Sequence, residues 1–476
     1  MEQVSNALSP KSKPIIVATS ATSVKNFGPA EVLGRLWFNE VVGRGDFAVE
    51  ADRFALKDVI RGMIDRRLHQ AAQEGNMVWY RTLLALTTSI LAGTGYEQEG
   101  RPKTLAEWMA AFKFESLHDG ARTGYTPLRF AVMDGRVDLV REILADETVD
   151  VNAPIAPKHA ELMFNLLPKL TILHQACMSQ HGEPMGEIVE MLLARGANPR
   201  LRSSAQKWTP MHLAVTSDCR PAIAALMRHD PLLHREQILA GLRVFERCAV
   251  GGQPSTMRWL LETYPDLIKP TLSKCCAAGL SWCLAACFEE NDAEMLQILI
   301  DAGADPNIDD GSWMPKPVRD KPLMRYVILP RVLALLHRTI KRPSNLIEVF
   351  SNCLGATPLH VVATHGNLRS LEVLLKAGAK LEGAYTQRHF NRATPLHCAA
   401  ACGHTAIAER LLEVSPGWIL VKDRGGKRPA YWAARRGYTS LAERLKALEE
   451  TAKASAKQKK SAKVAPGPEN PAQADW

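Results

Sequence analysis

The chain has 476 residues, of which 46% are hydrophobic and 23% charged, a composition typical of a folded, soluble protein. The formal net charge is +9, and residues 451–476 contribute +3 of it, as five lysines less two acidic residues. The longest uncharged apolar stretches, residues 82–93 and 275–288, are too short to cross a bilayer, so we expect no membrane span.

The first 125 residues precede the regular part of the chain. Residues 1–30 are rich in Ser, Thr, Ala, Lys and Pro and are predicted to be disordered. Residues 31–125 are predicted to form a helical N-terminal cap, because apolar side chains recur there at helical spacing. Within this cap, an extra helix is expected over residues 106–117, which carry Trp108 and Phe112.

A short motif recurs from residue 126 onward. Thr-Pro-Leu-His occurs at Thr357 and again at Thr394, 37 residues later (394 − 357), and each copy is followed by small residues, a Gly and a Leu-Leu pair. Close variants begin at three more threonines, and weaker ones at four other positions: Thr126, Thr171 and Thr209, then Arg243, Trp282, Lys321 and Arg428. Such self-similarity predicts a repeat architecture.

The copy at Thr394 shows what the motif does locally. Thr394 is expected to cap a helix with its hydroxyl, and Pro395 suits the first helical position because its missing N–H costs nothing there. Gly403 is expected to end this helix in a left-handed conformation, and residues 406–412 form a second helix with one apolar face. Since such a pair cannot bury its own core, it must stack on a neighbour.

This pattern resembles the ankyrin repeat, whose period is about 33 residues. The resemblance covers roughly Arg66 to Leu448 and implies an all-α ankyrin-repeat solenoid of about nine to ten imperfect helix-turn-helix repeats. It places a cryptic repeat within residues 31–125 and the array over residues 126–450. Residues 451–476, rich in Lys and then Pro, are predicted to be a disordered tail.

Motifs that carry catalysis are missing from the sequence. It contains no GxxxxGK[ST], HExxH or GxSxG, so we predict a protein that is not an enzyme and needs no cofactor or metal. Four clustered cysteines lack the paired spacing of a zinc site and are expected to be small core residues: Cys275, Cys276, Cys283 and Cys287. Four histidines share one repeat position, where the resemblance implies structural hydrogen bonds: His174, His212, His360 and His397.

The resemblance also indicates where a partner would bind. Ankyrin arrays bind on hairpin tips between repeats and on exposed faces of the first helices, so candidates lie just before each Thr-Pro anchor. They are basic and aromatic, the residue types enriched at binding hot spots: Arg388, His389, Phe390, Arg392, Arg424, Lys427, Arg202 and Trp208. An acidic peptide with an apolar residue would fit the tip at 385–392; the alternative is that Phe390 folds back and the arginines are only solvated.

These observations predict a monomeric, non-catalytic adaptor that binds another protein. The alternative is a nucleic-acid-associated protein that uses the basic tips and the lysines of residues 453–463. Phosphate contacts would make binding fall steeply with salt, which distinguishes the two. A short apolar run at the N-terminus that is no convincing signal peptide, together with ten cysteines, predicts reduced thiols in the cytoplasm, with the nucleus as the other possibility.

Overall fold

The computed structural model divides into two compact units, residues 1–259 and 260–476. Nine helix pairs occur among the residues that it describes, which are 15–20, 23–27, 50–91, 102–156, 169–179, 181–203, 207–237, 243–250, 253–273, 282–287, 293–307, 357–381, 393–423 and 425–463. Each unit is therefore built from the helix pairs that the repeated motif predicts, and each is described separately below.

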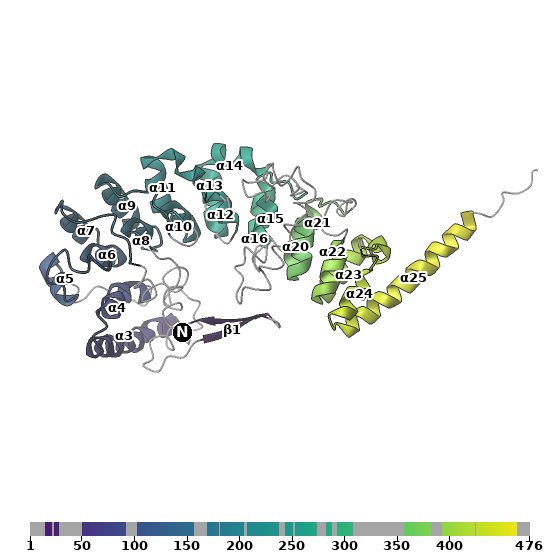
Figure 1. Cartoon of the computed structure of the whole chain (residues 1–476), viewed down its shortest axis with the longest axis horizontal. Helices are drawn as coiled ribbons and strands as arrows, with labels where there is room; N and C mark the ends of the chain where they lie inside the picture. Colours follow the sequence, from purple (N-terminus) through teal and green to yellow (C-terminus); the bar gives the residue numbers. More distant parts are fainter. Residues whose placement is uncertain are drawn as a thin grey trace, which may run out of the picture. The chain divides into compact units, whose positions relative to one another are not determined.

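The first unit contains the pairs α3–α4 to α10–α11 and helix α12, with the single helix α5 between α4 and α6 (Figure 1). The helices are α3 (Glu50–Gln73), α4 (Met77–Ile90), α5 (Leu105–Ala111), α6 (Pro127–Met133), α7 (Val137–Leu144), α8 (Ile172–Ala176), α9 (Pro184–Ala194), α10 (Pro210–Thr216), α11 (Arg220–His229) and α12 (Val244–Ala249). Helices α4, α6, α8, α10 and α12 contact one another in that order, and α7, α9 and α11 form a second row. The pairs thus stack as a solenoid requires.

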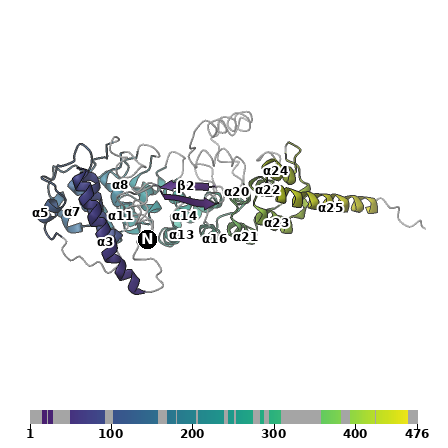
Figure 2. The ribbon, with the colours of Figure 1, turned by 90° about the horizontal axis from the view of Figure 1, so that it is seen from below.

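The second unit continues with α14 (Pro265–Leu272), and α13 (Pro254–Thr263) runs across the division between the units. Its paired helices are α15 (Trp282–Ala286), α16 (Ala293–Asp301), α20 (Pro358–His365), α21 (Leu368–Lys376), α22 (Pro395–Cys402), α23 (Thr405–Val414), α24 (Pro429–Arg435) and α25 (Thr439–Lys463). Figure 2 shows α20, α22 and α24 in one row and α16, α21 and α23 in another, as their contacts require.

Each anchor threonine starts a helix as the sequence predicts. Thr357 and Thr394 are N-caps with proline at the first helical position, and Gly366 and Gly403 end these helices with φ of 81° and 79°. Gly403 is required for a second reason, since a Cβ there would lie 2.4 Å from the ring of Tyr438 in the next repeat. Helix start, helix end and repeat packing are therefore all encoded in the motif.

An aromatic cluster closes the N-terminal end of the array. Trp108 on α5 is fully buried, stacks on Phe112 at 4.2 Å and donates Nε1–H to Asp134 Oδ2 at 3.2 Å. Phe114 packs 5.9 Å from Phe130, a residue of α6. The expected extra helix is confirmed, although α5 ends at Ala111, because the chain then turns to place these rings against the first strong repeat.

The repeat that begins at Thr126 has Arg129 where the four other threonine-anchored repeats have histidine. Arg129 is fully buried, and its Nε donates to the carbonyl oxygen of Gly124. Nη1 donates to Gln175 Oε1 at 2.8 Å, and Nη2 donates to the carbonyl oxygens of Ala153 and Leu170, both at 3.0 Å. Burial lowers the pKa of Arg129 to about 10, which still leaves it charged at neutral pH. One side chain thus joins this repeat to the next.

Two repeats of the second unit are direct neighbours although 49 residues (308–356) separate them in sequence. Asn307 Nδ2 donates to the carbonyl oxygen of Gly378 at 3.3 Å, and its Oδ1 accepts from the Lys380 amide at 2.6 Å. Asn152 makes the same two bonds to the following repeat, and α15 and α16 contact α20 and α21. The repeat expected from Lys321 lies outside the described residues.

We expect that deleting residues 312–350 leaves the protein folded. The deletion leaves ten residues between Asn307 and Thr357 (four plus six), as many as lie between Asn198 and Thr209, which join neighbouring repeats of the first unit. Because a shorter connection costs less entropy, the free energy of unfolding should change by only about 1 kcal/mol. Circular dichroism and urea denaturation measure this, and a large loss of helix would mean that the deleted residues belong to the stack.

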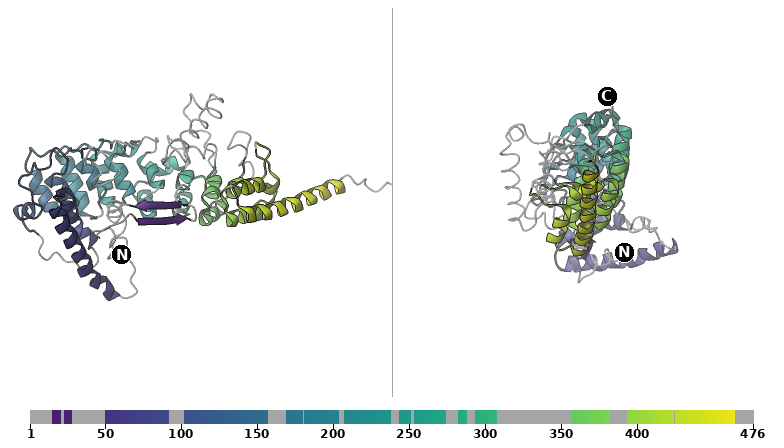
Figure 3. Two further views of the ribbon diagram at one scale, coloured as in Figure 1. Left: turned by 60° about the horizontal axis from the view of Figure 1, so that its bottom comes forward. Right: turned by 90° about the vertical axis from the view of Figure 1, so that its right-hand side faces the viewer.

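Regular elements are described within part of each terminal segment. Strands β1 (Ile15–Ser20) and β2 (Ser23–Phe27) form an antiparallel hairpin with Ile15 opposite Phe27, a pairing that β-branched and aromatic residues favour (Figure 3). Helix α25 continues to Lys463, because Ala and Lys favour helices and Lys453 pairs with Glu449 at 2.7 Å. The remaining residues of 1–30 and 451–476 lie outside the described part.

Candidate functional site

The repeated histidines serve the scaffold. In all four repeats, the threonine Oγ1 lies 2.7–2.9 Å from Nδ1 of the histidine three residues later. His174 Nε2 also lies 3.1 Å from the carbonyl oxygen of Trp208, at the start of the next repeat. Burial lowers the pKa of His174 to about 4, so the ring is neutral at neutral pH. The predicted structural role is confirmed.

The cysteines of the described repeats are core residues. Cys283 and Cys287 are buried, as predicted, and burial raises the pKa of the Cys283 thiol to about 12. Cys275 and Cys276 lie outside the described residues. No group of three or more His, Cys, Asp or Glu side chains placed to hold a metal ion occurs in the described parts of the chain.

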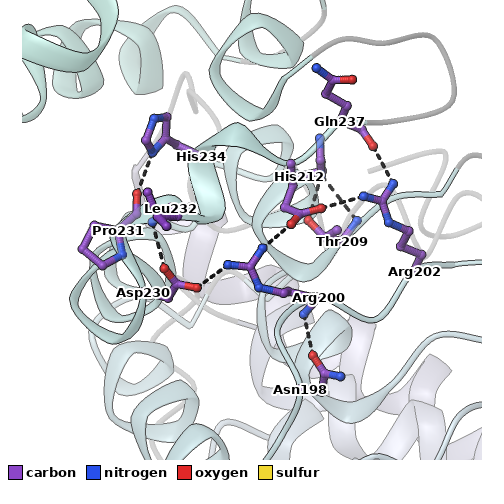
Figure 4. A network of polar contacts seen from close by, with 11 residues as sticks. Asn198, Arg200, Arg202, Thr209, His212, Asp230, Pro231, Leu232, His234 and Gln237 are labelled. Carbon is purple, nitrogen blue, oxygen red and sulfur yellow. Dashed lines mark hydrogen bonds and ion pairs between the residues drawn. The ribbon is translucent and has the colours of Figure 1, made fainter.

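The predicted tip residue Arg202 belongs to an ion-pair network (Figure 4). Its guanidinium donates to Glu236 Oε2 and to the carbonyl oxygen of Gln237, both at 2.6 Å. Arg200 pairs with the other oxygen of Glu236 and with Asp230. Both arginines are exposed, yet carboxylates of the chain itself already neutralise them, so this tip offers little free positive charge to a partner.

Trp208, the other candidate at this tip, contributes to the fold. Its carbonyl oxygen accepts from the Ser203 amide at 2.9 Å as well as from His174, and the Arg247 guanidinium lies 5.1 Å above its ring. The side chain is half-buried. Partner contact by Arg202 and Trp208 therefore stays a prediction.

The other candidates lie at the tips before α22 and α24. Arg388, His389, Phe390, Arg392 and Arg424 lie outside the described residues, and Lys427 is described and exposed. Asp423 shapes the tip of Lys427, because its Oδ1 accepts from the Lys427 amide and its own amide donates to the Lys427 carbonyl oxygen, both at 2.8 Å. That carbonyl also lies 3.2 Å from His397 Nε2, which ties the tip to the preceding repeat.

Lys427 belongs to a group that we call the α24 surface, defined as Lys427, Tyr431, Trp432, Arg435 and Arg436. The Lys427 ammonium lies 4.6 Å from the ring centroid of Tyr431, and the Arg435 guanidinium lies 5.6 Å from that of Trp432. The two rings meet edge to face at 5.7 Å. Tyr431 is 39% exposed and Trp432 is half-buried, so the surface combines cations with accessible aromatic area.

The cations of the α24 surface differ from several arginines on the second helices of the array. Among the described residues, no ion pair links Lys427, Arg435 or Arg436 to a carboxylate. By contrast, Arg141, Arg228, Arg410 and Arg444 on the second helices all pair with glutamates of neighbouring repeats. Positive charge is thus compensated along the outer helices and left available on α24.

Sequence analysis identified Lys427 but not the aromatic residues beside it. Tyr431 follows Arg428 by three residues, the spacing between Thr394 and His397 in the preceding repeat. Where four earlier repeats have a buried histidine ring, this last described repeat has a larger ring that is exposed. Aligning the repeats position by position would have shown this exchange.

Comparison with known proteins matches the helix pairs to one family. The family model described as "Ankyrin repeat" matches residues 123–155, 169–204, 354–383 and 391–423, which hold four of the five threonine anchors. This chain contains ankyrin repeats. Arg202 lies within one matched repeat, and the α24 surface follows the last of them.

Known relatives share part of the array. The chain is 38% identical over 82 residues to a Caenorhabditis elegans "Transient receptor potential cation channel subfamily A member 1 homolog", which is 17% of this ankyrin-repeat protein and 6% of the relative. It is 24% identical over 379 residues to the Arabidopsis thaliana "E3 ubiquitin-protein ligase KEG" (75% and 20%) and 37% identical over 78 residues to the human "Ankyrin repeat domain-containing protein SOWAHB" (16% and 10%). The matches span a fifth or less of each relative.

No helix in the described part of this ankyrin-repeat protein is long and apolar enough to cross a membrane.

Proposed function

We propose that this ankyrin-repeat protein is a non-catalytic scaffold that binds a partner protein through its tips and the exposed faces of its first helices. The observation that carries the proposal is how the array uses its reactive side chains. The described anchor histidines form capping boxes, and most of the described cysteines are buried in the core. What remains accessible on the tips is charged and aromatic, which suits binding.

The relatives support a scaffold over any one activity. Their names describe a channel, a ubiquitin ligase and an ankyrin-repeat domain protein, so the names share no reaction, and the family match covers repeats alone. Function resides in sites placed on a fold and not in the fold itself. We propose the cytoplasm as the place of action, with the nucleus as the alternative, and a monomer as the acting form.

An acidic protein segment is the partner class that we propose, with Arg388 and Arg392 among its contacts. Nucleic acid is the second candidate, and the network at Arg200 and Arg202 weighs against it, because Asp230 and Glu236 would repel phosphate. A stripe of phosphate-binding arginines would have to be free of such carboxylates.

The change Arg388→Glu with Arg392→Glu tests the tip. We expect partner capture from a cell lysate, followed by mass spectrometry, to fall about tenfold, because like charges at an interface disfavour binding. The control is Arg66→Glu with Arg122→Glu, two exposed arginines of the first unit that cause the same change in net charge.

Equal capture by wild type and the tip variant, with equal thermal melting, would move the binding site elsewhere on the array. Capture of nucleic acid that falls steeply with salt, and not of protein, would instead favour the second candidate.

A further inference from the structure

We propose that the α24 surface is a docking site for an acidic peptide segment that carries an apolar side chain, an inference that rests on the proposed protein-binding function. The α24 surface lies apart from the tip of Arg388 and Arg392 in sequence, and every residue that defines it is described. Three properties support the proposal: a rigid base, uncompensated positive charge and an exposed aromatic ring.

The base of the surface is held by a buried carboxylate. Asp423 is 8% exposed, and its Oδ2 accepts from Trp432 Nε1 at 2.8 Å while Oδ1 accepts from the Lys427 amide. The underlying face of α24 is fixed by Ala433, which is fully buried. The rings and cations therefore occupy set positions before a partner arrives, which lowers the entropy that binding must overcome.

Within the described ranges, no carboxylate forms an ion pair with the cations of the surface. Lys427, Arg435 and Arg436 are exposed, as is the neighbouring Lys422, and the nearby Asp423 is already engaged by Trp432 and the backbone. A partner with two or more carboxylates would supply charge-assisted hydrogen bonds like those that glutamates of the chain provide to Arg228 and Arg410. Electrostatic complementarity of this kind selects acidic partners and speeds their association.

Tyr431 supplies the apolar part of the contact. It is one of five large hydrophobic side chains that are exposed among the described residues. It contacts Lys427 of the preceding tip on one side and Arg435 of α24 on the other. An apolar side chain placed on this ring would be surrounded by the cations, which would then pair with its flanking carboxylates. Aromatic residues in such a setting dominate the energy of many interfaces.

The same geometry favours a peptide over single-stranded nucleic acid. Base stacking needs an open aromatic face, and the Lys427 and Arg435 cations already occupy one face of Tyr431 and of Trp432, respectively. A peptide requires only the edge and the remaining face of Tyr431. Nucleic acid is therefore an outcome that the experiment must distinguish.

The test uses the full-length protein and a fluorescein-labelled synthetic peptide in which Glu pairs flank a central Leu-Phe. Fluorescence anisotropy gives the Kd for wild type, for Lys427→Glu with Arg435→Glu, for Tyr431→Ala, and for the charge-matched control Arg66→Glu with Arg122→Glu. A peptide with Gln for every Glu and an oligo-dT of similar length complete the set. Circular dichroism checks that each variant is folded.

We expect the variant with Lys427→Glu and Arg435→Glu to raise the Kd for the Glu peptide at least about tenfold, and Tyr431→Ala to raise it about fivefold. The control variant should bind with a Kd within about twofold of wild type. The Gln peptide should bind at least about tenfold more weakly than the Glu peptide. An equal Kd for wild type and for the variant with Lys427→Glu and Arg435→Glu would overturn the inference. So would oligo-dT that binds wild type more tightly than the Glu peptide does and no longer binds this variant. If lysate capture depends on Arg388 and Arg392 while the peptide does not bind, the scaffold proposal survives and the α24 site alone fails.

Discussion

Replacing Arg129 by Met is expected to lower the free energy of unfolding by about 3–5 kcal/mol, because buried acceptors that lose a donor each cost about 1–3 kcal/mol. The guanidinium donates hydrogen bonds to three carbonyl oxygens and to the side-chain oxygen of Gln175, and it is fully buried. Met fills a similar volume but donates nothing, so water would have to enter or the repeats separate.

Arg129→Lys separates charge from geometry. Lysine keeps the positive charge but lacks the planar fork of arginine, so it cannot reach all four acceptors at once, and we expect nearly the same loss as for Met. Arg228→Met is the matched control, because Arg228 is exposed and pairs with Glu190 on the surface, where ion pairs contribute less than about 1 kcal/mol.

Urea denaturation of the full chain, with hydrogen exchange to locate the loss, measures these effects. Protection should fall first in α6 and α8, the helices that Arg129 joins. An Arg129→Met variant as stable as wild type would show that the side chain only fills space.

Acid is expected to weaken the array through His174. Burial lowers the pKa of His174 from 6.5 to about 4, so between these values the unfolded chain binds a proton that the folded chain excludes. Its contribution is therefore complete above about pH 6.5 and is lost as the pH falls toward 4, which amounts to about 3 kcal/mol for a difference of about 2.5 pKa units. Burial also lowers the pKa of His397, so the second unit should respond in the same direction.

His174→Gln tests this assignment. Glutamine can still donate to the Trp208 carbonyl oxygen but does not titrate, so the variant should be less stable than wild type at pH 7.5 and approach it at pH 4.5. The measurement is the free energy of unfolding in urea at several pH values. Parallel curves for wild type and variant would show that carboxylates or other histidines cause the acid loss.

Local sequence signals predicted the structure most accurately. Threonine, proline and glycine fix the start and end of a helix within a few residues, so the helices after Thr357 and Thr394 begin and end where predicted. The burial of Cys283 likewise follows from the repeat position. The same reasoning overestimated disorder near Lys453, since a Pro- and Lys-rich composition masked a stretch with strong helix propensity.

Contacts between residues that are distant in the sequence could not be predicted from the sequence. The pairing of Arg202 with Glu236, 34 residues away, could not be read from the sequence. Neither could the role of Arg129, because three of its four acceptors lie 24 or more residues away. The bond from Asn307 to Gly378, 71 residues away, is another contact that no local pattern predicts.

The bridge from Asn307 to Gly378 also makes this chain a natural host for an inserted domain. The two ends of the 308–356 segment are joined to repeats that contact each other. An inserted protein whose own termini lie close together could therefore replace this segment without separating the two repeats. A fluorescent reporter placed there would be carried on a fixed arm of the scaffold. It would move with the repeats that flank it and leave both chain ends free.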